Sequence, residues 1–291
     1  MNVISPSQFN QEMIDELFDS ASKLEKNYDD FLNGKIMATV FLEPSTRTRL
    51  SFESAMLRLG GKVISCSDLA SSSVAKGETV YDTIMTVSQY ADVVVVRSPM
   101  PINPHVKFPV PVINAGDGSC NHPTQALLDA YTIWKIHGKI DNLKIGIAGD
   151  LRGSRTIHSL VELLKHRNDL NLLDTMDCQN KLPEEVLCGS PTYHNEFDFD
   201  KIIPELDVLY TNRIQIERHK VEHHPRPVFS IDDRRMRLLS ENAIVMNPGP
   251  RREELPEKFD EDPRVVFFKQ ARNGVYIRMA LLKYIFENLD I

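Results

Sequence analysis

Residues 35–68 read KIMATVFLEPSTRTRLSFESAMLRLGGKVISCSD and change their hydrophobic pattern twice. The first eight residues are a short apolar run that is typical of a buried strand, and residues 62–68 follow a second strand pattern. Between them, Thr46 to Leu59 carries apolar residues at helical spacing. A strand, a helix and a strand in this order predict a parallel sheet that is covered by helices on both faces.

The same alternation runs through the rest of the chain. In the first half, the pattern predicts further helices at 7–26, 78–90 and 122–138, and further strands at 91–97 and 110–116. The second half repeats the alternation, with strands predicted at 144–150, 170–173, 207–213, 243–248 and 265–270, and helices at 155–165 and 273–289. Residues 178–200 and 218–237 are less regular.

We therefore expect an α/β protein with two doubly wound parallel-sheet domains joined by interdomain helices. The length of 291 residues agrees with about two domains of roughly 150 residues. We place the first domain at 1–137 and the second at 138–273, with the C-terminal helix 274–291 packing back on the first domain. Ligands of such sheets bind beyond the carboxyl ends of the strands, so the loops after the strands are the candidate sites.

The composition argues against several classes of protein, including general nucleic-acid-binding and membrane proteins. The formal net charge of −7 argues against a uniformly cationic surface for nucleic-acid binding, but leaves room for a local basic pocket for a small anion. No apolar run approaches the roughly 18 residues of a membrane span, and the first residues do not resemble a secretion signal. The four cysteines are too far apart for a metal or redox motif: Cys66, Cys120, Cys178 and Cys188. We expect a cytoplasmic protein with reduced thiols and with no nucleic-acid or membrane partner.

The loop after the first strand carries an unusual set of polar residues, because residues 43–49 read EPSTRTR and run directly into a helix. The first amides of a helix lack intrahelical partners and lie at the positive end of its dipole. Hydroxyl groups and an arginine on that turn predict a site for an anion, most simply phosphate: Ser45, Thr46, Arg47 and Thr48. The alternative is that Ser45 or Thr46 only caps the helix.

Two further strand ends carry polar side chains. Arg97 ends the strand 91–97, where a guanidinium can hold both a phosphate oxygen and a carbonyl oxygen, or can simply pair with a carboxylate. His122 precedes the helix after the strand 110–116, and Gln125 lies in its first turn. A lone histidine is more often a satisfied polar group than a catalyst. Its position beside Gln125 at another strand end favours a functional site.

In the second half, Arg155 stands near a helix start, and Arg213 and Gln215 follow a strand. Two residues apart, Arg213 and Gln215 point the same way if the extended conformation persists. A surface ion pair is the alternative for either arginine. The residues between Gly146 and Gly153 are spaced GxxGxxxG, not GxGxxG, so we interpret them as a structural turn and not as a dinucleotide site.

Three histidines have some metal-like spacing: His219, His223 and His224. No predicted strand or helix fixes them, and a solvated loop is the better interpretation. We predict no metal and no cofactor.

Taken together, these loops resemble the carbamoyltransferase family. Residues 41–53 match the carbamoyl phosphate signature of that family, and residues 114–125 are similar to its aspartate branch. The resemblance extends through residues 279–282 and so covers essentially the whole chain. It implies an enzyme that transfers the carbamoyl group of carbamoyl phosphate to the α-amine of L-aspartate, which gives N-carbamoyl-L-aspartate and phosphate, an early step of de novo pyrimidine biosynthesis. Residues 1–137 would then bind carbamoyl phosphate, and residues 138–273 aspartate.

The resemblance also implies a role for each site residue. The phosphate is bound by Ser45, Thr46, Arg47 and Thr48, while the carbonyl oxygen contacts Thr48, Arg97 and His122, and Gln125 orients the carbamoyl nitrogen. The aspartate carboxylates are held by Arg155, Arg213 and Gln215, and backbone carbonyls are offered by Pro248 and Gly249. Ser72 and Lys76 belong to a loop that reaches the adjacent subunit in relatives, where Lys76 contacts both substrates and takes part in catalysis. A homotrimer with shared active sites follows, and regulatory or other pathway chains are further candidate partners.

The chain departs from the family at three places. Asn247 precedes Pro248 where relatives carry a histidine, Ser98 follows Arg97 where a histidine is common, and Gly153 replaces an aromatic or histidine position. Asn247 cannot titrate, so no acid or base role is expected there. These departures leave two alternatives: a carbamoyltransferase with another amino-acid acceptor, and a catalytically inactive scaffold or ligand-sensing subunit.

Overall fold

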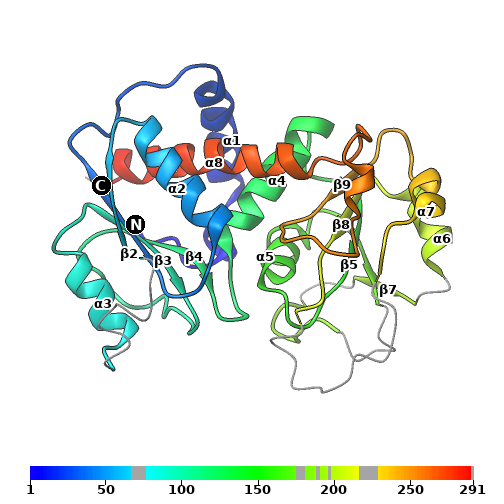
Figure 1. The fold of residues 1–291 in the computed structure, drawn as a ribbon, viewed down its shortest axis with the longest axis horizontal. Coiled ribbons are helices and arrows are strands. Elements are labelled where there is room, and N and C mark those ends of the chain that lie inside the picture. Colours follow the sequence, from blue (N-terminus) through cyan, green and yellow to red (C-terminus); the bar gives the residue numbers. More distant parts are fainter. Residues whose placement is uncertain (67–76, 175–180, 188–190, 196–197, 216–228, 290–291) are drawn as a thin grey trace. The chain divides into compact units, whose positions relative to one another are not determined.

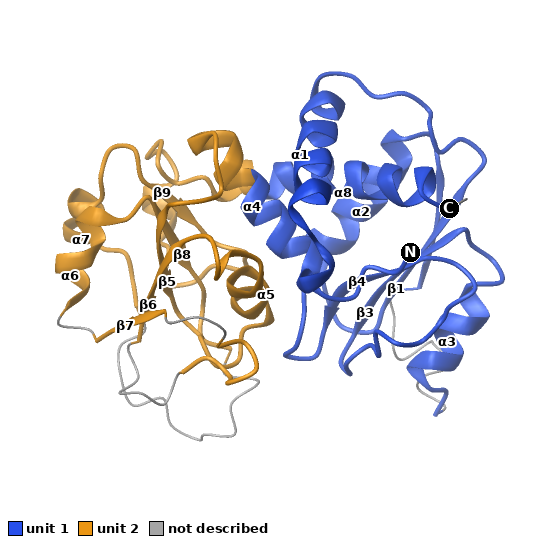
Figure 2. Ribbon diagram, turned by 180° about the vertical axis from the view of Figure 1, so that it is seen from behind, with its two compact units in different colours: residues 1–131, 271–291 blue, residues 132–270 orange. Residues whose placement is uncertain are grey.

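The computed structural model describes residues 1–66, 77–174, 181–187, 191–195, 198–215 and 229–289. The chain divides into two compact units, of which unit 1 comprises residues 1–131 and 271–291, and unit 2 residues 132–270 (Figure 2). Each unit contains one parallel sheet (Figure 1). No helix in the described ranges combines the length and apolar character needed to cross a membrane.

The sheet of unit 1 has the strand order β2-β1-β3-β4. Its strands are β1 (Ile36–Phe41), β2 (Lys62–Cys66), β3 (Val93–Ser98) and β4 (Val112–Asp117). The helices that begin or end in this unit are α1 (Gln11–Lys26), α2 (Thr46–Arg58), α3 (Val80–Val87), α4 (Pro123–His137) and α8 (Phe267–Glu287). A short 3-10 helix, Pro6–Gln8, precedes α1. In both views, α1, α2 and α8 gather on one side of the sheet and α3 lies on the other (Figures 1 and 2).

Both faces of β1, β3 and β4 are buried, as expected of parallel strands between helices, whereas the edge strand β2 is largely exposed. Alternate residues of β1 and β3, among them Val40 and Val96, form one core cluster with Ile84 of α3. The amphipathic helix α1 begins at the cap residue Asn10, whose side chain accepts a hydrogen bond from the Met13 amide. The paired strands place the ends of β1, β3 and β4 at one edge, where the candidate residues of this unit follow.

The sheet of unit 2 has the order β7-β6-β5-β8-β9 and is also parallel. Its strands are β5 (Lys144–Ala148), β6 (Asp169–Leu173), β7 (Thr192–His194), β8 (Val208–Thr211) and β9 (Ile244–Met246). Its helices are α5 (Arg155–Leu164), α6 (Phe199–Ile202) and α7 (Asp233–Leu238), with 3-10 turns at Ile203–Glu205 and Glu257–Phe259. One core cluster joins residues of β5, β8 and β9 to α6 and α7, with Leu209, Phe199 and Met236 among its members.

The predicted fold class is confirmed, with two parallel α/β sheets and a C-terminal helix that belongs to the first unit. The predicted strand at 265–270 is wrong, because α8 begins at Phe267 and only Val265 makes an isolated bridge to Val245. A short apolar run such as VVFF has no period that separates a strand from a buried helix start. The segments expected to be irregular contain β7, the beginning of α6 and most of α7.

Candidate active site

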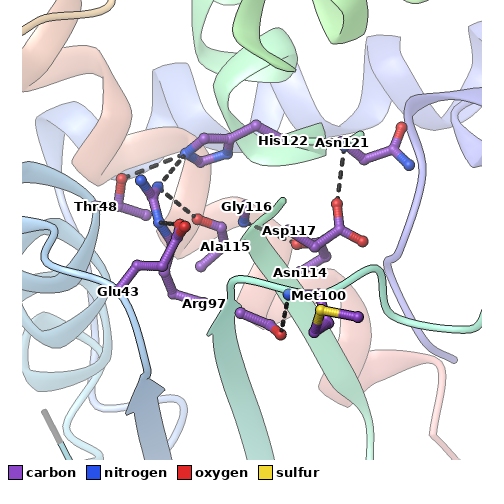
Figure 3. A network of polar contacts seen from close by, with 11 residues as sticks. Glu43, Thr48, Arg97, Met100, Asn114, Ala115, Gly116, Asp117, Asn121 and His122 are labelled. Atoms are coloured by element: carbon purple, nitrogen blue, oxygen red, sulfur yellow. Dashed lines mark hydrogen bonds and ion pairs between the residues drawn. The ribbon is translucent and has the colours of Figure 1, made fainter. Parts of the chain in front are cut away.

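Thr48, Arg97 and His122 come together at the carboxyl edge of the sheet in unit 1 (Figure 3). The His122 Nε2 atom lies 3.4 Å from Thr48 Oγ1 and 3.5 Å from Arg97 Nη1. Thr48 comes from the first turn of α2, Arg97 from the end of β3, and His122 from the residue before α4. His122 and Thr48 are buried, with exposed fractions of 2% and 6%. Three polar groups from distant parts of the sequence therefore meet in a place with little water.

The Arg97 guanidinium is held in a fixed orientation by two acceptors. Its Nε donates to Glu43 Oε2 at 3.2 Å, and its Nη1 donates to the Ala115 carbonyl at 3.1 Å (Figure 3). The ion pair considered from the sequence is thus present. Both acceptors bind nitrogen atoms of one planar guanidinium. Together they therefore fix its position beside His122. The sequence analysis did not assign this role to Glu43, although the residue stands inside the EPSTRTR signature.

The loop that carries His122 is built around buried Asp117. One carboxylate oxygen accepts from the Asn121 amide at 2.8 Å, and the other accepts from the Ile102 amide at 2.8 Å. Gly116 has a φ of 111°, a backbone conformation that favours glycine, and its amide donates to the Asn114 side chain. The carboxylate and the glycine together hold the chain in the tight turn that delivers His122.

The N-terminus of α2 is the predicted phosphate site. Ser45 occupies the N-cap position, but its side chain makes no capping hydrogen bond, so the capping alternative does not describe this residue. Thr46 and Arg47 are exposed on the same turn. The surrounding chain partly desolvates the Arg47 guanidinium and lowers its pKa, although a guanidinium stays charged at neutral pH. Hydroxyls, a cation and helix amides are thus available together.

In unit 2, the loops after the neighbouring strands β5 and β8 carry the predicted acceptor residues. Arg155 is the first residue of α5 and is 4% exposed. Arg213 and Gln215 are half-buried on either side of buried Ile214, which is the alternation of an extended segment. Asp150 connects the two loops, because its Oδ2 accepts from the Gln215 amide at 2.9 Å and its Oδ1 from the Gly153 amide at 2.8 Å.

The turn after β5 has a structural reason for its glycine. Gly149 has a φ of 120°, and a Cβ at this position would lie 1.9 Å from the Asn212 carbonyl oxygen. The close approach of the two loops therefore requires glycine here, in agreement with the interpretation of this segment as a structural turn.

The loop with Pro248 and Gly249 follows β9 and is organised by Asn247, which is 2% exposed. The Asn247 Nδ2 group donates to Thr211 Oγ1 at 3.1 Å and to Glu254 Oε1 at 3.0 Å. Its Oδ1 accepts from the Gly249 amide at 2.7 Å. Asn247 thus connects this loop to the end of β8. The sequence marked this residue as a departure from relatives, but gave no sign of its three partners.

Several predicted residues lie outside the described ranges: Ser72, Lys76, Cys178, Cys188, His219, His223 and His224. Cys66 is a free thiol, and Cys120 is exposed. Among the residues that the structure describes, no group of three or more His, Cys, Asp or Glu side chains is arranged to hold a metal ion.

Comparisons with known proteins assign both halves of the chain to one family. Residues 1–135 match the family model "Aspartate/ornithine carbamoyltransferase, carbamoyl-P binding domain", and residues 141–285 match "Aspartate/ornithine carbamoyltransferase, Asp/Orn binding domain". The aspartate carbamoyltransferase catalytic subunit of Thermococcus onnurineus is 44% identical, with 97% of this chain and 95% of the relative covered. The corresponding subunit of Lachnoclostridium phytofermentans is 42% identical, with 97% and 96% covered.

Solved structures give the same result. The catalytic subunit of M. jannaschii aspartate transcarbamoylase has a TM-score of 0.85 and 40% identity, with 99% of both chains covered. Aspartate transcarbamoylase from Trypanosoma cruzi, solved in complex with N-(phosphonacetyl)-L-aspartic acid, has a TM-score of 0.87 and 35% identity, with 97% of this chain and 94% of that chain covered.

Proposed function

Because the chain belongs to the aspartate/ornithine carbamoyltransferase family, we propose that it transfers the carbamoyl group of carbamoyl phosphate to the α-amine of L-aspartate. The products are N-carbamoyl-L-aspartate and inorganic phosphate, and the reaction belongs to de novo pyrimidine biosynthesis. The T. cruzi relative was solved in complex with carbamoyl phosphate and aspartate together, which are the two substrates of this reaction.

The observation that carries the proposal is the meeting of Thr48, Arg97 and His122. When the amine attacks the carbamoyl carbon, the carbonyl oxygen gains negative charge, the C–O bond to phosphate breaks, and the amine loses a proton. Preorganised donors aimed at such an oxygen are usually the largest catalytic contribution. The 3.4 Å and 3.5 Å separations put all three groups within reach of one oxygen atom. Arg97 is a permanent cation and Glu43 fixes its orientation.

The donor side of the site is assigned to unit 1. Ser45, Thr46, Arg47 and Thr48 bind the phosphate, and Gln125 orients the carbamoyl nitrogen. The absence of a capping bond to Ser45 supports this role, because its hydroxyl is not needed by the helix. Residues 1–137, with the C-terminal helix 274–291, form the carbamoyl phosphate-binding domain in this proposal, and residues 138–273 form the aspartate-binding domain.

The acceptor side is assigned to unit 2. Arg155, Arg213 and Gln215 bind the two carboxylates of L-aspartate, and Pro248 and Gly249 offer backbone carbonyls. Two arginines match a dicarboxylate through paired charge-assisted hydrogen bonds. The hydrogen bonds from the Gln215 and Gly153 amides to Asp150 support the assignment, because they join the two loops that carry the arginines.

We include a homotrimer in the proposal, with Ser72 and Lys76 of one subunit completing the site of the next and Lys76 contacting both substrates. The outer face of α2 and the edge strand β2 support an interface, because they expose three large apolar side chains: Leu50 at 50%, Leu57 at 60% and Ile64 at 42%. Large apolar side chains exposed on neighbouring elements are typical of an interaction surface. We place the enzyme in the cytoplasm, in agreement with the free thiol of Cys66.

The test is a phosphate-release assay with carbamoyl phosphate, in which L-aspartate and L-ornithine are offered separately and the product is identified by mass spectrometry. Wild type is compared with Arg47→Ala. Arg237→Ala is the matched control, since Arg237 is an exposed arginine of α7 that belongs to no predicted site.

We expect N-carbamoyl-L-aspartate from wild type and Arg237→Ala, and its loss in Arg47→Ala. If the enzyme reacts with ornithine and not with aspartate, the acceptor is ornithine and the assignment of aspartate is wrong. If carbamoyl phosphate binds but neither acceptor reacts, the inactive scaffold or sensor replaces the enzyme as the function.

A further inference from the structure

Gln125 is tied to a carboxylate one turn further along α4. Its Nε2 group donates to Asp129 Oδ1 at 2.9 Å, and both residues are buried, with exposed fractions of 7% and 0%. An amide side chain has one end that donates and one that accepts, whereas an ionised carboxylate only accepts. The contact with Asp129 therefore determines which way the Gln125 amide is turned.

This orientation has a chemical consequence at the other end of the amide. With Nε2 committed to Asp129, Oε1 is the end left to face a ligand, and a carbonyl oxygen can only accept. A carbamoyl group carries an NH₂ group, which donates. An amide turned the other way would set two donors against each other.

A buried cation accompanies Asp129. Arg278 of α8 is 2% exposed, its Nη1 donates to the Gly274 carbonyl at 3.2 Å, and its guanidinium lies 4.9 Å from the centre of the Phe52 ring. Gly274 makes room for it, since a Cβ there would lie 2.6 Å from Arg278 Nη1. Complete burial lowers the pKa of Arg278 to about 9, and the negative charge of Asp129 opposes this shift. Arg278 thus supplies a buried positive charge that attracts the Asp129 carboxylate.

We propose that Asp129 is a positioning residue that fixes the orientation of the Gln125 amide, and that it thereby selects a donor substrate with NH₂, not CH₃, on its carbonyl carbon. This inference rests on the proposed function, because it uses Gln125 as the contact to the carbamoyl nitrogen. Asp129 itself acts only through Gln125.

Two stable phosphonates test this selectivity. Phosphonoacetamide and acetonylphosphonate carry the same phosphonate and carbonyl groups and differ only in NH₂ against CH₃. Their dissociation constants are measured by titration calorimetry on wild type, Asp129→Asn, Gln125→Ala and the double variant. Asp15→Asn is the matched control, because Asp15 accepts from Gln11 one turn away at 2.6 Å, on the exposed face of α1.

Wild type and Asp15→Asn should prefer phosphonoacetamide. In Asp129→Asn that preference should fall by about threefold to tenfold, because asparagine can donate as well as accept and so no longer fixes which end of the Gln125 amide faces it, while acetonylphosphonate binds as before. Gln125→Ala should lose the same preference. Adding Asp129→Asn to it should change the preference no further, because Asp129 acts through Gln125.

Equal weakening of both phosphonates in Asp129→Asn would overturn the inference and leave Asp129 with a structural role. An unchanged preference in that variant would overturn it as well. If wild type binds neither phosphonate, the proposed function fails, and the inference fails with it.

A second measurement needs no folded Asp129 variant. The side-chain amide of Gln125 is observed by NMR in wild type labelled with ¹⁵N-glutamine, and is assigned by its loss in Gln125→Ala. Slow exchange of its amide protons without ligand is expected, since Asp129 already holds them. Rapid exchange would contradict the inference.

Discussion

Glu43 and the Ala115 carbonyl fix the position of Arg97, because they accept hydrogen bonds from its Nε and Nη1 atoms. Lysine keeps the charge but loses the planar fork, so it cannot satisfy both acceptors and still reach the carbonyl oxygen. We expect Arg97→Lys to lower kcat by about 100-fold to 1,000-fold, the loss typical of one oxyanion donor. Glu43→Gln keeps an acceptor for Arg97 Nε and should cost much less. Steady-state kinetics with carbamoyl phosphate and aspartate make the comparison, and equal losses would contradict it.

Replacing Asn247 with aspartate should destabilise the fold. The Asn247 side-chain amide donates to the carboxylate of Glu254, which is 1% exposed. Asn247→Asp would bury two carboxylates within hydrogen-bond distance. Their repulsion raises the pKa of one of them. A raised carboxyl pKa in the folded state costs stability at neutral pH, and the cost shrinks as the pH falls and the pair takes up a proton.

We expect Asn247→Asp to lower the free energy of unfolding by about 3 kcal/mol at pH 7 and by less at pH 5, measured by urea unfolding. Asn212→Asp is the matched control. Asn212 is also buried but donates to the hydroxyls of Ser154 and Thr156, which can turn and donate instead. The explanation is wrong if both variants lose the same stability at both pH values.

For individual residues, the sequence predicted Thr48, Arg97 and His122 as site residues, because each follows a recognisable strand or opens a helix at a strand end. It did not identify what holds them. Glu43 lies 54 residues from Arg97, and pairing them requires the register of β1 and β3. The contact of Gln125 with Asp129 is local, but four-residue spacing alone does not separate a buried pair from a solvated one.

The N-terminal serines of α5 and α2 differ in whether their side chains cap the helix or are available to bind a ligand. Ser154 accepts a hydrogen bond from the Ile157 amide and so caps α5, whereas Ser45 makes no capping bond at α2. Ser154→Ala should therefore lower the free energy of unfolding by about 1 kcal/mol. Ser45→Ala should leave stability nearly unchanged and weaken the binding of carbamoyl phosphate. Urea unfolding and ligand titration of both variants decide, and a stability loss in Ser45→Ala would contradict the assignment.

Periodicity predicted the elements with long patterns, such as α1 and α4, and failed where patterns were short. The run VVFF at 265–268 has the composition of a strand, but it leads into a helix of 21 residues because the apolar period of 3.6 continues past it. The three residues of β7 and the four of α6 are too short for any period to appear.

Lowering the pH should reduce the stability of unit 2 through the protonation of Asp260. The Arg251 guanidinium, stacked 4.8 Å from the centre of the Phe267 ring, hydrogen-bonds to Asp260 and holds the pKa of that carboxyl below its ordinary value. A lowered folded-state pKa means that the contribution is present above the unfolded pKa of about 3.9 and is lost as the pH falls through the lower folded value.

We expect Asp260→Asn to lower the urea midpoint at pH 7 and to have little effect near pH 2. Asp198→Asn is the control. Lys201 lowers the pKa of Asp198 as well, but on the open surface, where solvent screening leaves an ion pair with little effect on stability. A loss for Asp260→Asn that does not change with pH would exclude the ion pair as its cause.

For the whole molecule, the α2–β2 surface is the feature that a single chain leaves unexplained. Leu50 and Leu57 are seven residues apart on α2, so they share one helix face, and Ile64 follows on the edge strand β2. An edge strand beside exposed leucines invites association. In the proposed trimer this surface is covered, and the sites are complete only when subunits meet.

We therefore expect Leu57→Glu to dissociate the assembly, because it would bury an unpaired charge in the interface. Ile136→Glu is the matched control, since Ile136 is 44% exposed on α4 and belongs to unit 2. Light scattering after gel filtration should give about three times the chain mass of 33.2 kDa for wild type and the control, and a smaller mass for Leu57→Glu. Activity of Leu57→Glu should rise with protein concentration, because in the proposed trimer a neighbour supplies Ser72 and Lys76. A monomeric wild type with full activity would contradict both the trimer and the shared site.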